Sequence, residues 1–99
     1  MNRKELIDGV KEKIDDYSRQ DVVLAVDTFF QSIKDALLRE ERVELRGFGV
    51  FSVTTREARM ARNPKTGESV YRPPTRYLLF RGGKELTEMI NDRKETHDL

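Results

Sequence analysis

Residues 56–69 contain almost no side chain that a core could bury, and this feature constrains the fold more than any other. The segment contains Asn63-Pro64 and Thr66-Gly67, two pairs that are typical of a turn. Basic residues flank that turn on both sides: Arg56, Arg59, Arg62 and Lys65 lead to it, and Arg72, Arg76 and Arg81 follow it. We therefore expect a long β-hairpin arm, about residues 56–76, that lies on a negatively charged partner. Nucleic acid suits such an arm best.

A solvated hairpin with scattered charge is the simpler interpretation of the same residues. An isolated hairpin with no buried face is only marginally stable in water, however, which weakens that interpretation. For Pro64 the simpler interpretation is turn chemistry, because proline is common at the second position of a turn.

Length and composition limit what else the chain does. A chain of 99 residues forms one domain, and with 36% apolar and 37% charged residues it is soluble with a thin core. It has no cysteine, no signal peptide and no apolar run near the roughly 18 residues of a membrane span, which favours the cytoplasm. No catalytic set, metal-ligand cluster or phosphate loop is visible, and the single histidine, His97, stands in a polar tail. We expect no enzyme, metal, cofactor, membrane or small-molecule substrate.

Charge is distributed unevenly along the chain. Residues 1–40 carry a net charge of −2, residues 41–81 carry +5, and residues 82–99 carry −2. A chain with an overall charge of +1 can therefore still bind nucleic acid through its middle section.

Hydrophobic periodicity predicts an α+β chain. Helices are expected at 3–15 and 19–39, after possible N-caps at Asn2 and Ser18. A strand is expected next at 43–46, and a second strand from residue 51. Between them lies a tight turn whose glycines, Gly47 and Gly49, need positive φ. The arm comes next, with Pro73-Pro74 interrupting its return. A strand at 77–80, a short helix from residue 84 and a frayed polar tail at 92–99 complete a three-stranded antiparallel sheet between helices.

Three segments occur in a fixed order: Gly-Phe-Gly-Val-Phe at 47–51, Arg-Asn-Pro-Lys-Thr-Gly at 62–67 and Phe-Arg-Gly-Gly-Lys-Glu-Leu at 80–86. With these segments the chain closely resembles the HU and integration host factor family of bacterial nucleoid proteins over residues 1–91. The resemblance implies an intertwined dimer, with an identical or a paralogous chain, whose two arms reach around double-stranded DNA and bend or compact it. It also implies a location at the bacterial nucleoid.

The same resemblance implies the site. Pro64 would be a wedge that enters a base step from the minor groove, a mechanism of which this family is itself a standard example. Lys84 would bind phosphate at the start of the last helix. Arg46 would enter a narrow minor groove, or would instead form an ion pair on a solvated sheet face, either across the strands or with the nearby Glu44. The expected DNA-binding residues are Arg46, Arg56, Arg59, Arg62, Asn63, Pro64, Lys65, Arg76, Arg81 and Lys84.

Three departures from the family pattern bear on how DNA is held. Leu78 replaces a usual proline, Pro73-Pro74 stands in the returning strand, and acidic residues crowd the first two helices. The acidic helices suggest a shorter wrapped site or weaker non-specific binding. A general DNA-coating protein with little sequence preference is a closely related functional hypothesis. The alternative of another class is a structural or protein-interaction module of the same fold with weak or no DNA binding. Phe30, Phe48, Phe51 and Phe80 are expected in the core, and the thin composition suggests a core shared between two chains.

Overall fold

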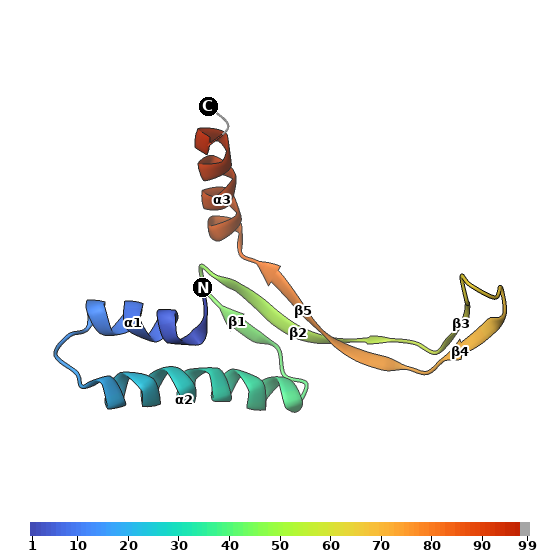
Figure 1. The fold of residues 1–99 in the computed structure, drawn as a ribbon, viewed down its shortest axis with the longest axis horizontal. Coiled ribbons are helices and arrows are strands. Elements are labelled where there is room, and N and C mark those ends of the chain that lie inside the picture. Colours follow the sequence, from blue (N-terminus) through green and yellow to red (C-terminus); the bar gives the residue numbers. More distant parts are fainter. Residues whose placement is uncertain (98–99) are drawn as a thin grey trace.

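The computed structural model describes the backbone of residues 1–97 and the side chains of residues 1–92. The chain forms a helical pair, a twisted sheet that extends into an arm, and a last helix that projects from the sheet (Figure 1). The element order is α1 (Arg3–Lys13), α2 (Arg19–Leu38), β1 (Val43–Leu45), β2 (Gly49–Arg56), β3 (Arg59–Arg62), β4 (Ser69–Arg72), β5 (Thr75–Gly82) and α3 (Lys84–His97). The predicted α+β architecture is confirmed.

Helices α1 and α2 begin where their capping residues predict. The Asn2 side chain accepts a hydrogen bond from the Glu5 N–H at 2.9 Å, and the Ser18 hydroxyl accepts one from the Asp21 N–H at 3.1 Å. Each cap satisfies a backbone donor that the first helical turn leaves unpaired. Ile7 of α1 packs with Val22 and Val26 of α2, and among the described residues these three side chains are the buried hydrophobic core.

Strands β1, β2 and β5 form an antiparallel sheet in the order β1-β2-β5. Because side chains alternate along a strand, the register divides the sheet into two faces. Phe51, Val53, Leu78 and Phe80 lie on the inner face, and Phe51 and Leu78 line a cavity together with Phe30 and Leu37 of α2. The opposite side, the outer face, carries Val50, Thr54, Arg56, Tyr77 and Arg81.

The arm consists of two ladders separated by a break. The β2–β5 ladder ends where Arg56 pairs with Thr75, and the β3–β4 ladder begins where Arg59 pairs with Arg72. The break consists of residues 57–58 and 73–74, which belong to no strand. Proline has no N–H to donate to a ladder, so the predicted interruption at Pro73-Pro74 is confirmed. We call residues 59–72, beyond the break, the outer hairpin.

The two glycines between β1 and β2 serve different purposes. Gly47 has a φ of +83°, as predicted. For Gly49 the prediction of positive φ was wrong, because only Gly47 and Gly67 among the described glycines have it. A Cβ on Gly49 would instead lie 2.5 Å from the Arg81 carbonyl oxygen and 2.6 Å from Cζ of Phe80. Gly49 is therefore required by the close approach of β5 and the Phe80 ring.

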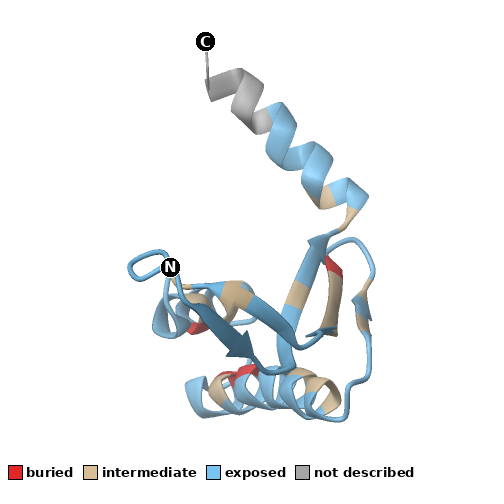
Figure 2. Ribbon diagram, turned by 90° about the vertical axis from the view of Figure 1, so that its right-hand side faces the viewer, coloured by how far each residue is buried: buried red, intermediate tan, exposed pale blue. Residues whose placement is uncertain are grey.

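A single chain leaves much of its apolar surface uncovered. Phe30, Phe48 and Phe80 are each at least 40% exposed, and so are Met89 and Ile90 of α3, which projects away from the helical pair (Figures 1 and 2). The radius of gyration is 19.7 Å, whereas a compact domain of this length has about 13 Å. The structure is thus that of a subunit of an intertwined dimer, and the predicted phenylalanine core is incomplete within one chain.

The C-terminal segment differs from its prediction as a frayed tail. Helix α3 continues to His97, so it is longer than the short helix expected and includes residues 92–97. Asp98 and Leu99 lie outside the described residues.

Glu40 adopts a left-handed conformation directly after α2. Its φ is +62°, and no other described non-glycine residue has a positive φ. Glycine takes this conformation at a helix end without steric cost. We predict that Glu40→Gly is more stable than Glu40→Ala by about 1 kcal/mol, since both variants lose the carboxylate and only alanine keeps the strain. Urea unfolding of both variants measures the difference, and an alanine variant as stable as the glycine variant would contradict the prediction.

Candidate nucleic-acid interface

The arginines up to residue 81 fall into two groups. Five of them form ion pairs: Arg3 with Asp27 at 2.7 Å, Arg19 with Asp8 at 2.7 Å, Arg39 with Glu41 at 3.0 Å, Arg42 with Glu44 at 2.9 Å and Arg76 with Glu40 at 2.6 Å. Within residues 1–92, the other six have no acidic partner: Arg46, Arg56, Arg59, Arg62, Arg72 and Arg81. These six lie on the arm or along the strands and turn that lead to it. A group of arginines without acidic partners is well suited to binding a polyanion.

Arg39 illustrates the paired group. Its hydrogen bond and its charge lower the pKa of the Glu41 carboxyl below the usual value, and Glu41 raises the pKa of Arg39 in return. Glu41 therefore stays ionised even somewhat below its ordinary pKa, and protonation disrupts the pair only as the pH falls through the lowered value. At neutral pH both groups are charged, and Arg39 already has its counter-ion.

Strand register sets where the unpaired arginines point. Arg56 and Arg81 lie on the outer face of the sheet, and Arg46 directly follows β1, in which Glu44 pairs with Val50 of the same face. Arg46 does not pair with Glu44, because Glu44 pairs with Arg42. The ion-pair interpretation of Arg46 with Glu44 is therefore wrong, and its guanidinium remains free of acidic partners among the described residues.

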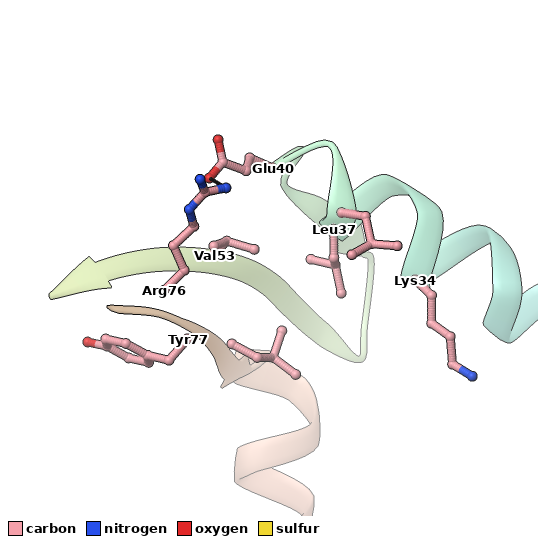
Figure 3. A pocket seen from close by; sticks show the side chains of 8 residues that line it. Lys34, Leu37, Glu40, Val53, Arg76 and Tyr77 are labelled. Atoms are coloured by element: carbon pink, nitrogen blue, oxygen red, sulfur yellow. Dashed lines mark hydrogen bonds and ion pairs between the residues drawn. The ribbon is translucent and has the colours of Figure 1, made fainter. Parts of the chain in front are cut away.

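Arg76 is separated from the other predicted arginines. It pairs with Thr55 on the inner face of the sheet, and its Nη1 donates to Oε1 of Glu40. Figure 3 shows the two side chains meeting beside a cavity of about 450 Å³ that Leu37 and Val53 also line. Arg76 would have to leave Glu40 before it could bind a phosphate.

The arm tip is fixed by hydrogen bonds around Asn63. The Gly67 N–H donates to the Asn63 carbonyl at 2.7 Å, and the Asn63 N–H donates to the Glu68 carbonyl at 2.8 Å. The Asn63 side-chain oxygen accepts from the Lys65 N–H at 2.9 Å. Asn63 thus shapes the turn, while the exposed Pro64 and Lys65 stand at its end.

Lys84 stands at the first position of α3, as predicted. Its ammonium lies 4.0 Å from Glu88, and the side chain is 89% exposed. A contact of this length in water contributes little, so Lys84 remains available to an anion beside the positive end of the helix dipole.

The structure adds Arg72, which the predicted set of binding residues lacked. Arg72 lies opposite Arg59, and together with Arg56 they line a hollow of about 460 Å³. Counting outward from the turn, where Asn63 bonds to Glu68, would have placed Arg72 opposite Arg59. The two prolines that follow Arg72 indicated an interrupted ladder and gave no signal of a binding role.

Two other features are absent from the described part of the chain. None of its helices is long and apolar enough to cross a bilayer. Its His, Asp and Glu side chains form no group of three that would hold a metal ion.

The chain is similar to known DNA-binding proteins of one bacterial family. The family model described as "Bacterial DNA-binding protein" matches residues 1–91. Integration host factor subunit beta of Saccharophagus degradans is 42% identical over 93% of this chain and 94% of that protein. The corresponding subunit of Methylococcus capsulatus is 41% identical over 96% of this chain and all of that protein.

The fold of this chain is also similar to solved structures of HU proteins. The HU protein of Anabaena, solved in a cocrystal with DNA, superimposes with a TM-score of 0.79 at 36% identity. The match covers 91% of this chain and 97% of that chain. HU from Thermotoga maritima has a TM-score of 0.60 at 32% identity, covering 91% and 98% of the two chains.

Proposed function

Because the chain belongs to the HU and integration host factor family of bacterial DNA-binding proteins, we propose that it bends duplex DNA through arms tipped by Pro64. It is an architectural protein of the bacterial nucleoid and not an enzyme. Its partners are double-stranded DNA and a second subunit.

The binding mode is inferred from the group of six arginines without acidic partners. The arginines of the two N-terminal helices are paired with Asp side chains, whereas every arginine of the arm except Arg76 is without an acidic partner within residues 1–92. Each guanidinium that replaces counter-ions on a phosphate favours binding, and the effect does not depend on base sequence.

A second subunit follows from the exposed apolar surface. The half-exposed phenylalanines and the uncovered side of α3 need a partner to leave water, because large apolar patches are otherwise a liability. The partner is a second copy of the chain or a paralogue, and the relatives named subunit beta belong to a factor with more than one subunit.

The roles of individual residues follow from their positions. Arg56, Arg59, Arg62 and Lys65 bind phosphates along the arm, Arg46 and Arg81 extend this surface over the sheet, and Lys84 binds phosphate beside the start of α3. Asn63 holds the turn that presents Pro64, and Arg76 contributes only after it exchanges Glu40 for DNA. We place this DNA-binding unit in residues 1–91, with the arm at about 56–76.

Pro64 is expected to control bending more than affinity. Its ring is exposed, apolar and without an N–H, so it enters a base step without burying a lone donor. Unstacking that step costs a few kcal/mol, which contacts along the bent duplex offset. Pro64→Ala should therefore keep most of the affinity, lose much of the bend and show a smaller preference for nicked or mismatched DNA. Energy transfer between labelled duplex ends reports the angle.

Lys65→Ala is the matched control at the same turn. It removes a charge and leaves the wedge, so affinity should fall while the bend angle stays unchanged. A Pro64→Ala variant that bends DNA like the unmodified protein would restrict Pro64 to turn chemistry.

A further inference from the structure

Three arginines converge where the arm is broken. Arg56 ends β2, Arg59 begins β3 and Arg72 ends β4, and all three line the hollow of about 460 Å³ beside the break. Ala61, Thr75 and Tyr77 complete its walls, so no acidic side chain among the described residues lines it. We call this hollow the arginine notch.

The charges in the notch are arranged unfavourably for a free protein. Arg59 and Arg72 are direct cross-strand partners, and like charges placed opposite each other destabilise a strand pair. Arg56 lies 5.7 Å from the centre of the Tyr77 ring, a distance that suits a cation–π contact. None of the three guanidinium groups has an acidic partner within residues 1–92. An anion between them would remove the repulsion.

The notch also spans two structural units. Arg56 belongs to the β2–β5 ladder, whereas Arg59 and Arg72 belong to the outer hairpin. No strand pairing crosses the break at residues 57–58 and 73–74. A ligand that all three arginines hold would connect the two units directly.

We propose that Arg56, Arg59 and Arg72 bind one phosphate group of the DNA backbone together, and that this phosphate fixes the outer hairpin relative to the sheet. A phosphodiester supplies oxygen acceptors on one compact anion, and guanidinium groups bind such oxygens in fork geometry. Arg72 thereby becomes a positioning residue as well as a phosphate ligand. The proposal rests on the proposed DNA-binding function and adds the shared ligand to it.

The salt dependence of duplex binding separates one shared phosphate from three. Removing one bound phosphate from each arm should lower the slope of log affinity against log salt by about 0.9 per arm, and hence by about 1.8 for a dimer with two arms. If the phosphate is shared, the slope of the triple variant R56Q/R59Q/R72Q falls by about 1.8 in total, whereas three separate phosphates predict a decrease of about 5.4. Arg62 lies on the other face of the outer hairpin, so adding R62Q to the triple variant should remove a further 1.8 or so.

A second measurement detects the positioning role. Backbone relaxation in the DNA complex should show residues 59–72 moving independently of the sheet in R72Q, but not in R62Q. A decrease in slope of about 5.4 or of about zero in the triple variant, or equal mobility in R72Q and R62Q, overturns the proposal. If the unmodified protein itself shows a flat salt response and no bending, the proposed function fails instead, so the two failures are distinguishable.

Discussion

The affinity of the protein for duplex DNA is expected to fall by roughly 10³–10⁵ when salt rises from about 50 mM to about 200 mM, given about six to ten phosphates neutralised per dimer. The physical reason is the release of condensed counter-ions, which salt opposes. Each subunit offers six arginines without acidic partners among the described residues, and Lys65 and Lys84 add further charge. Two subunits therefore provide enough cations to neutralise that number of phosphates.

Paired and unpaired arginines should respond differently in this measurement. Arg62→Ala should make the salt dependence shallower, whereas Arg59→Ala alone should do so only if Arg59 binds a phosphate that Arg56 and Arg72 do not share. Arg19→Ala is the control, because Arg19 is already paired with Asp8 in the helical body and should leave the slope unchanged. A flat response of the unmodified protein would instead favour a protein-interaction module of the same fold.

Local sequence signals predicted the elements well. Asn2 and Ser18 located the starts of α1 and α2, and the double proline located the break in the arm, because caps and prolines act through their own neighbouring backbone. The arm was predictable for a similar reason. Its lack of apolar side chains is a property of composition and needs no knowledge of packing.

Features that depend on contacts distant in sequence were not predictable in this way. The pairing of Arg76 with Glu40 joins residues 36 positions apart, and it requires both the left-handed turn after α2 and the register of β5. The need for glycine at position 49 was wrongly attributed to positive φ, because the close approach of Phe80 is visible only in the folded sheet. Arg72 was missed since its significance lies in the residue opposite it.

Phe80→Ala is expected to lower the free energy of unfolding by roughly 3–5 kcal/mol, as truncation of a buried phenylalanine does. The Phe80 ring lies 4.7 Å from the Phe51 ring and 5.6 Å from the Phe48 ring, measured between centroids. It also fills the space that Gly49 leaves open. In one chain Phe80 is 41% exposed, so the full cost arises only if a second subunit covers the ring.

The dependence on a second subunit gives this prediction a further test. If folding and dimerisation are coupled, the urea midpoint rises with protein concentration. Tyr71→Ala is the control, because Tyr71 is 61% exposed on the outer hairpin and surface truncations usually change stability by less than about 0.5 kcal/mol. A midpoint independent of concentration would mean that the chain folds without a second subunit, and equal costs for the two variants would mean that no second subunit buries Phe80. The exposed aromatic surface, which no other part of the described chain covers, would in that case not be a subunit interface.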